Sequence, residues 1–134
     1  MNLIVDTNVL FSALYESNSN AGRLILQAIE GKFSLFAPEL VKNELGRNLV
    51  GKLAYTKKEV REVIAALPVK WIESGIYATA IETARRCITH EADLPVLACS
   101  LVTGYDIVSG DKHLLSIKPK IAKVWELKQL MQKI

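Results

Sequence analysis

Short, mostly apolar segments alternate along this chain with longer segments of helical periodicity. Four segments have the length and composition of buried strands, and a fifth is a weaker candidate: residues 3–5 (LIV), 33–37 (FSLFA), 69–73 (VKWIE), 106–110 (DIVSG) and 123–127 (KVWEL). Short strands that are almost entirely apolar are typical of a parallel sheet covered by helices on both faces. We therefore predict an α/β fold, a three-layer α/β/α sandwich around a central, mainly parallel sheet of four to five strands.

The connecting segments carry helical signals. The expected helices span residues 9–15, 21–29, 38–49, 56–67, 77–88 and 94–102, and a short helix follows the last strand. Thr56 and Glu59 have the spacing of a capping box, and Gly31 and Gly104 stand where C-terminal caps belong. Cys87 and Cys99 are both expected on helices, as small residues of the core.

Size and charge restrict the interpretation only mildly. The 134 residues suit one domain spanning 1–134, and a half-hydrophobic composition can bury a core. The formal charge of +3 permits a polyanionic partner without demanding one. The apolar start lacks basic residues and is interrupted by Asp6, and no apolar run approaches the roughly 20 residues needed to span a bilayer. We expect a soluble, cytoplasmic protein with reduced thiols.

Two aspartates follow strands of the predicted sheet. Asp6 comes directly after the first strand, and Asp111 follows the fourth. The carboxyl ends of parallel strands meet at one edge of a sheet, which is where ligands bind in such folds. Each residue alone is equally well explained as a helix N-cap.

Two further acids belong to helical segments. Asp93 precedes a helix with Pro95 in its first turn, so it too has a capping explanation, and Glu91 is its close rival for an acidic role. Glu44 lies beside Leu45 at the margin of an apolar stripe, where a solvated flank residue is the ordinary expectation.

Gathered at one sheet edge, these acids require a positive charge between them. Two carboxylates about 4 Å apart repel each other by about 4 kcal/mol in a partly buried setting. Lys112 is one candidate cation, although its side chain need not point toward Asp111. A divalent ion held by oxygen ligands alone would be Mg²⁺ or Mn²⁺ rather than zinc. His90 and His113 do not form a pair with metal-ligand spacing and are expected on the surface.

Three stretches resemble the PIN domain family, and within it the toxin-type, VapC-like ribonucleases of bacterial and archaeal toxin–antitoxin systems. They are IVDTNVLFSAL, which contains Asp6; ELVKNELGRNL, which contains Glu44; and ADLPVLACSLVTGYDIVSGDKHLL, which contains Asp93 and Asp111. The resemblance covers nearly the whole chain, in the family's order.

The resemblance implies a site and an activity. Asp6, Glu44, Asp93 and Asp111 correspond to the acidic quartet that binds one or two Mg²⁺ or Mn²⁺ ions. Three polar helpers would orient ligands or water: Asn8, Thr7 beside it, and Ser109 where the family often has Thr. The implied reaction is hydrolysis of RNA by metal-activated water. The implied partners are a small cognate antitoxin and a second copy of the chain in a homodimer.

Positive side chains recur on the middle helices, near Glu44 in sequence. They are Lys42, Arg47, Lys52, Lys57, Lys58 and Arg61. Each alone is ordinarily a solvated residue, but together they could guide a phosphate backbone without reading bases. Arg47 and Lys112 are the first candidates for substrate binding.

Two other functions remain open at this point. A phosphatase with an aspartyl nucleophile would also place Asp after the first strand, but it usually has a second Asp two positions on, where this chain has Asn8. A non-catalytic binding module of PIN fold would bind metal weakly or not at all. The complete set of acids favours the nuclease over this second alternative.

Overall fold

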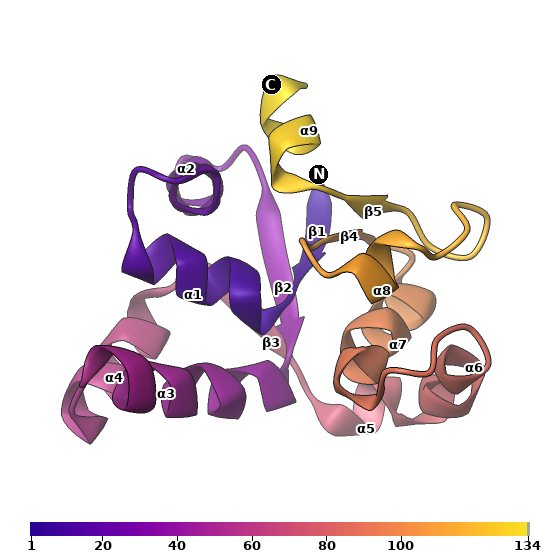
Figure 1. The fold of residues 1–134 in the computed structure, drawn as a ribbon, viewed down its shortest axis with the longest axis horizontal. Helices are drawn as coiled ribbons and strands as arrows, with labels where there is room; N and C mark the ends of the chain where they lie inside the picture. Colours follow the sequence, from indigo (N-terminus) through magenta and orange to yellow (C-terminus); the bar gives the residue numbers. More distant parts are fainter. Residues whose placement is uncertain (134) are drawn as a thin grey trace.

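One parallel sheet of five strands forms the centre of the computed structural model, which describes residues 1–133 (Figure 1). The strands are β1 (Asn2–Val5), β2 (Ser34–Pro38), β3 (Val69–Ile72), β4 (Asp106–Val108) and β5 (Val124–Trp125). Their spatial order is β3-β2-β1-β4-β5, and every neighbouring pair is parallel. The predicted parallel sheet is therefore confirmed, including its fifth strand.

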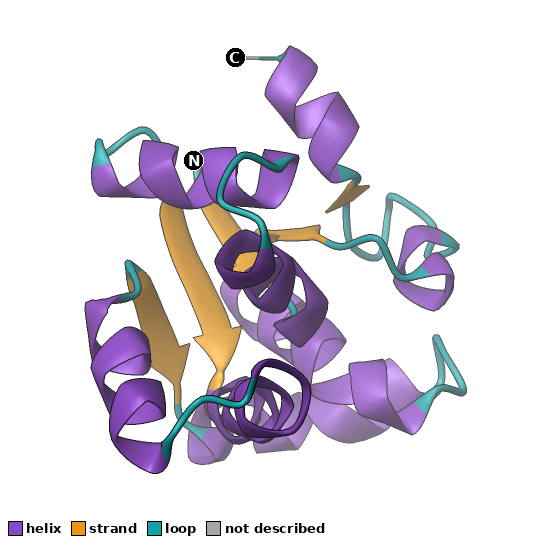
Figure 2. Ribbon diagram, turned by 60° about the vertical axis from the view of Figure 1, so that its left-hand side comes forward, coloured by secondary structure: helices purple, strands orange, loops and turns teal. Residues whose placement is uncertain are grey.

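Helices cover both faces of this sheet (Figures 1 and 2). The first group is α1 (Thr7–Tyr15), α2 (Asn20–Ile29), α3 (Glu39–Leu53) and α4 (Lys57–Ala66). The opposite group is α5 (Ser74–Tyr77), the 3₁₀ turn η1 (Ala78–Ala80), α6 (Ile81–Arg85), the 3₁₀ turn η2 (Glu91–Asp93), α7 (Leu94–Thr103) and α8 (Lys112–Leu115). The last helix, α9 (Leu127–Gln132), lies against α2. Within residues 1–133, no helix combines the length and apolar character needed to cross a membrane.

The central position of β1 follows from its composition. Leu3, Ile4 and Val5 are fully buried, because β2 and β4 pair with the strand on either side and helices cover both faces. Helix α7 packs against β1, β2 and β4, and it is apolar around most of its circumference, as a buried helix must be. The chain moves from β1 to β2 in one direction and later returns to β4 on the other side. The sheet thus has a topological switch point beside β1, the place where ligands of such folds bind.

Helix α1 begins two residues earlier than the sequence predicts. Asp6 is its N-cap, in an extended conformation, and its Oδ1 accepts a hydrogen bond of 3.0 Å from the Val9 amide. The capping role considered for Asp6 is therefore present, and Thr7 and Asn8 follow it in the helix. Both residues lie inside the first turn, because the chain turns immediately where β1 ends.

The single helix expected over residues 77–88 is also wrong. The segment divides into α5, η1 and α6, and a turn at residues 86–87 ends it. The tighter 3₁₀ spacing buries Tyr77 and Ala80 against α7, and α6 then buries Ala84. Cys99 is buried within α7 as expected, whereas Cys87 lies half-buried in the turn rather than on a helix.

Other boundaries agree more closely. The predicted capping box of α4 is present: the Thr56 hydroxyl accepts from the Glu59 amide at 3.1 Å, and the Glu59 carboxylate accepts from the Thr56 amide at 3.0 Å. Pro38 ends β2 and caps α3 instead of lying in its first turn. Strand β4 ends at Val108, so Ser109 and Gly110, which were expected within it, lie beyond the sheet.

Candidate metal site

A cavity of about 170 Å³ opens at the carboxyl ends of β1 and β4, at the switch point of the sheet. Its polar lining contains all four acids singled out from the sequence. The lining residues are Asp6, Thr7, Asn8, Leu40, Val41, Glu44, His90, Ala92, Asp93, Pro95, Val96 and Asp111. Residues that are as many as 105 positions apart in the sequence therefore meet in one hollow.

Asp6 is the most buried acid of the cavity, with 7% of its surface exposed. Its Oδ1 caps α1, and its Oδ2 accepts a very short hydrogen bond from the hydroxyl of Ser109. Ser109 is fully buried directly after β4. Its hydroxyl also accepts a hydrogen bond of 3.0 Å from the Asp111 amide. The two strands adjoining the cavity are thus tied together by this serine, consistent with its expected supporting position.

Asp111 caps the short helix α8. Its Oδ1 accepts from the His113 amide at 2.7 Å and from the Leu114 amide at 3.4 Å. The capping role considered from the sequence is therefore present at both Asp6 and Asp111. In each case the carboxylate also borders the cavity, so the two explanations do not exclude each other.

Asp93 has no capping role, although it immediately precedes α7. Its side chain makes no cap hydrogen bond to that helix. Instead, Oδ2 lies 2.8 Å from Nδ1 of His90. The carboxylate is buried to 8% exposure and faces the cavity, so the capping explanation for Asp93 is wrong.

The two histidines are exposed, as the sequence predicts, and they also lie beside the acids, which the sequence did not indicate. Their rings stack at 4.5 Å between centroids and 15° between planes. Nδ1 of His113 lies 3.3 Å from Oδ1 of Asp111 and 3.9 Å from Oδ2 of Asp93. Sequence spacing gave no sign of this, because His90 and His113 are 23 residues apart and meet only when η2 and α8 pack at the same edge.

Glu44 reaches the cavity from the second turn of α3. It is half-buried, and within residues 1–133 its side chain takes part in no hydrogen bond or ion pair. Asn8 and Thr7 line the same cavity from the first turn of α1. Glu44 is thus the one acid of the four that is not held by a protein donor in the described part of the chain.

The remaining candidates lie elsewhere. Glu91 is exposed and pairs with Arg85 at 3.5 Å, and it does not line the cavity. Arg47 belongs to a separate groove between α3 and α4, together with Lys57 and Arg61. Lys112 is exposed and does not line the cavity either. Across residues 1–133, no side-chain nitrogen of a Lys or Arg lies within 4 Å of a carboxylate oxygen of the four acids.

Burial and crowding change the acidity of this group. Burial, together with the nearby charges of Asp93 and Asp111, raises the pKa of Asp6, although the bonds from Ser109 and the Val9 amide oppose it. Burial likewise raises the pKa of Asp93, and the bond from His90 opposes it. Burial also acts on Asp111, but the His113 and Leu114 amides outweigh it and lower the pKa of that carboxyl.

The donor set fits a divalent cation. Four carboxylates converge on one cavity, and the only basic groups within 4 Å of them in residues 1–133 are two imidazoles. Hard oxygen donors suit Mg²⁺ and Mn²⁺, and a cation would relieve the repulsion that raises the pKa of Asp6. The arrangement is an acidic site, with donors that suit a divalent cation, at the switch point of a parallel sheet.

A profile of the PIN domain family matches residues 4–133. The chain belongs to the PIN domain family. No curated protein sequence matches it.

Solved structures share the fold at low sequence identity. VapBC2 from Rickettsia felis, bound to a promoter DNA fragment, superposes with a TM-score of 0.66 and 16% identity over 94% of this chain and 98% of that chain. A toxin–antitoxin complex from Klebsiella pneumoniae superposes with a TM-score of 0.69 and 16% identity, over 93% of this chain and 97% of that chain. PAE2754 from Pyrobaculum aerophilum superposes with a TM-score of 0.60 and 16% identity, over 99% of this chain and 88% of that chain. At this identity, the likeness establishes the fold.

Proposed function

We propose that this protein is a metal-dependent endoribonuclease that acts as the toxin of a toxin–antitoxin pair. The observation that carries the proposal is the convergence of Asp6, Glu44, Asp93 and Asp111 on one cavity without a Lys or Arg within 4 Å in residues 1–133. Family membership supports the nuclease assignment, and two structural neighbours are described as toxin–antitoxin assemblies.

The four carboxylates would hold one or two Mg²⁺ or Mn²⁺ ions. When bound, such an ion acidifies a water for attack on a phosphodiester and neutralises charge on the leaving oxygen. The chain's own contribution is to fix the ligands in advance. Ser109 and the Val9 amide hold Asp6, and the amides of α8 hold Asp111, so few side-chain rotations remain to be frozen when the substrate arrives.

Asn8 and Thr7 have supporting positions in this proposal. Both border the cavity from the first turn of α1, where a side-chain amide or hydroxyl can orient a water beside the carboxylates. Ser109 acts through Asp6, since its hydroxyl bonds that carboxylate and lies fully buried.

The RNA backbone would approach over the basic helices α3 and α4. Arg47, Lys57 and Arg61 border one groove there, and Glu44 lies on the same helix as Arg47. Lys112 would contact phosphate at the other side of the cavity, next to Asp111. Contacts of this kind recognise phosphate rather than base identity.

A small antitoxin would block or distort the acidic cavity, and the toxin would work as a homodimer in the cytoplasm. Support for the antitoxin comes from the neighbours from Rickettsia felis and Klebsiella pneumoniae, both solved as complexes. Co-purification of a small partner with the natively expressed protein would test this part of the proposal.

Removing single carboxylates tests the nuclease. We expect Asp6→Asn and Asp93→Asn each to lower the rate of RNA cleavage in Mn²⁺ by more than about 100-fold, because a first ligand matters more than the outer partners whose loss costs 10–100-fold. Both variants keep the volume of the side chain. The measurement is cleavage of a labelled RNA by the purified full-length chain.

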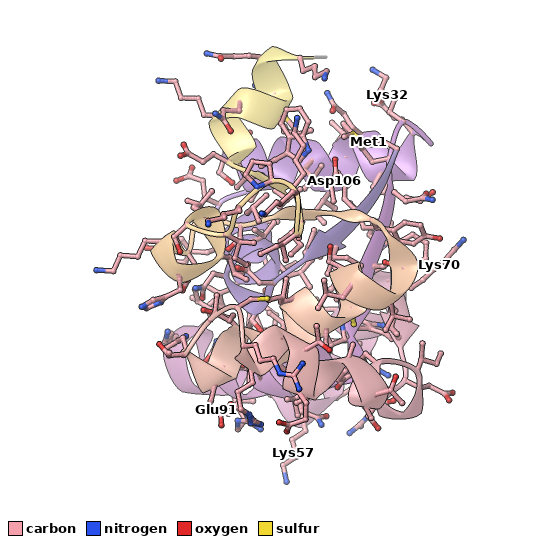
Figure 3. All side chains as sticks on the ribbon, turned by 90° about the vertical axis from the view of Figure 1, so that its right-hand side faces the viewer. Met1, Lys32, Lys57, Lys70, Glu91 and Asp106 are labelled. Carbon is pink, nitrogen blue, oxygen red and sulfur yellow. The ribbon has the colours of Figure 1, made fainter. Side chains whose placement is uncertain are left out.

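Asp106→Asn is the matched control. Asp106 begins β4 at the opposite end of the sheet, where it accepts a 2.9 Å hydrogen bond from Trp125 Nε1 that an Asn oxygen can also accept. Figure 3 shows Asp106 in the upper half of the molecule and Glu91 near the bottom. Unchanged cleavage by Asp106→Asn is expected, and parental rates in both site variants would overturn the metal mechanism.

A further inference from the structure

The two stacked histidines and two of the aspartates form a group of four potential metal ligands. His90, Asp93, Asp111 and His113 each offer one ligand atom, and these four atoms all lie within 4.8 Å of one another. Oδ2 of Asp93 is shared, at 2.8 Å from one imidazole and 3.9 Å from the other. The nitrogen atoms therefore face the same carboxylates that border the acidic cavity.

The stack fixes the orientation of both rings. Each histidine is nearly half exposed, which would normally leave its ring free to rotate. Here the rings contact each other at 4.5 Å in nearly parallel planes, and each Nδ1 is directed to a carboxylate oxygen. A pair of imidazole nitrogens is thus presented to a cation at little further cost in side-chain entropy.

This donor set differs from that of the acidic quartet. Mg²⁺ takes oxygen ligands almost exclusively, whereas imidazole nitrogen suits Zn²⁺ and other transition ions. A site with two nitrogens and two oxygens therefore discriminates between these classes of ion. Asp6 and Glu44, which lie outside the group, add oxygen ligands only.

We propose that His90, Asp93, Asp111 and His113 form a mixed nitrogen and oxygen subsite that makes this protein prefer a transition ion, of which Zn²⁺ is the test case, over Mg²⁺. The proposal rests on the proposed function, since it assigns a metal selectivity to part of the same site. An ion bound by Nδ1 of His90 and Oδ2 of Asp93 would replace the 2.8 Å contact between them, and a proton held there would be released to solvent.

A purely orienting role for the histidines has a different consequence. If His90 and His113 only hold the carboxylates in place, their loss lowers the affinity for every divalent ion to the same extent. If they are ligands, their loss lowers the affinity for Zn²⁺ and leaves the affinity for Mg²⁺ unchanged. The ratio of the two affinities therefore distinguishes ligation from orientation.

Calorimetric titration of the untagged full-length chain with Zn²⁺ and, separately, Mg²⁺ tests the proposal. We expect His90→Gln and His113→Gln each to lower Zn²⁺ affinity by about tenfold or more and to leave Mg²⁺ affinity unchanged. Thr89→Gln is the matched control, because it places the same new side chain at the exposed position beside His90 and removes no ligand. Both histidines are exposed enough for Gln to be accommodated, and circular dichroism verifies folding.

The outcomes separate the two proposals. Equal losses of affinity for Zn²⁺ and Mg²⁺ in the histidine variants, or no loss for either ion, would overturn the proposed subsite. The proposed acidic nuclease site would be unaffected. Failure of the parent to bind Mg²⁺ or Mn²⁺ at all would overturn the proposed function itself. Co²⁺ gives a second readout, because its visible absorption spectrum should change on removal of an imidazole ligand and not in Thr89→Gln.

Discussion

Asp6 joins local folding to the chemistry of the cavity. One of its oxygens caps α1, and the other accepts from Ser109, yet the residue is nine-tenths buried beside two other acids. An N-cap stabilises the folded protein by about 1 kcal/mol, whereas burying an ionised carboxylate near like charges destabilises it. The raised pKa of Asp6 shows that burial and repulsion outweigh the two hydrogen bonds.

The raised pKa of Asp6 predicts a pH-dependent stability in the absence of divalent ions. Between the ordinary value of 3.8 and the raised value, the native state binds more protons than the unfolded state. The free energy of unfolding therefore falls as pH rises through this window, and Asp93, whose pKa is also raised, acts in the same direction. Asp111, whose pKa is lowered, adds stability as pH rises toward 3.8, below this window. Asp6→Asn removes the Asp6 contribution and retains a good N-cap.

We expect the stability of Asp6→Asn relative to the parent to increase from pH 4 upward and then to level off. Urea denaturation in EDTA at several pH values measures this difference. A difference between variant and parent that is constant with pH would contradict the assignment. Titration with Mn²⁺ near neutral pH is the control, because the ion should stabilise the parent more than the variant.

At the residue level, the sequence predicted the acids better than their surroundings. Asp6 and Asp111 were recognisable because each follows a strand of a parallel sheet, and strand ends converge by topology. The contacts of His90 and His113 were not recognisable, since they depend on how η2 and α8 pack. Glu91 and Asp93 could not be separated by spacing, and only the 3₁₀ turn directs one to the cavity and the other to Arg85.

Among the secondary-structure elements, the start of α2 depends on a close approach that only glycine allows. A Cβ on Gly22 would lie 2.0 Å from the carbonyl oxygen of Ser17, which belongs to the backbone and cannot swing aside. We expect Gly22→Ala to lower the free energy of unfolding by about 3 kcal/mol, at the upper end of the usual cost of overpacking. Urea denaturation measures the change.

Gly51→Ala provides the matched comparison within α3. A Cβ there meets no heavy atom within 4 Å, so the substitution gains helix propensity and should raise the free energy of unfolding by about 0.5–1 kcal/mol. Similar effects of the two substitutions would show that the approach of Ser17 to Gly22 is not as tight as described.

Element boundaries were predictable where a local signal exists. The Thr56–Glu59 capping box and Gly104, which ends α7 with φ of 77°, both act within a few residues, and the sequence showed them. The break in residues 77–88 has no such signal. It arises because Tyr77, Ala80 and Ala84 all pack against α7, a tertiary contact that periodicity alone does not reveal.

At the scale of the whole molecule, groups of the protein itself hold three of the four acids in place. Asp6, Asp93 and Asp111 each have a hydrogen-bond partner within the protein, and the core beneath them is continuous and apolar. The fold therefore does not resemble small metal-dependent domains, in which the ion supplies the folding free energy.

We expect EDTA to abolish RNA cleavage while leaving a folded protein with a cooperative unfolding transition. The free energy of unfolding should drop only by the linkage amount, about 2.7 kcal/mol if the ion was present at 100 times its dissociation constant. Far-UV circular dichroism and urea denaturation, with and without EDTA, provide the measurement. Loss of the cooperative transition in EDTA would show that the metal is structural, and restoration of cleavage by added Mn²⁺ is the control.

The contrast between Asp6 and Glu44 has an evolutionary consequence. Replacing Asp6 by a residue that cannot accept hydrogen bonds removes a helix cap and leaves Ser109 without its partner, so the chain loses stability together with activity. The side chain of Glu44 makes no hydrogen bond or ion pair in the described part of the chain, and its loss leaves α3 intact. In lineages where the activity becomes a burden to the host, we expect inactive but well-folded descendants to lose the glutamate before the first aspartate.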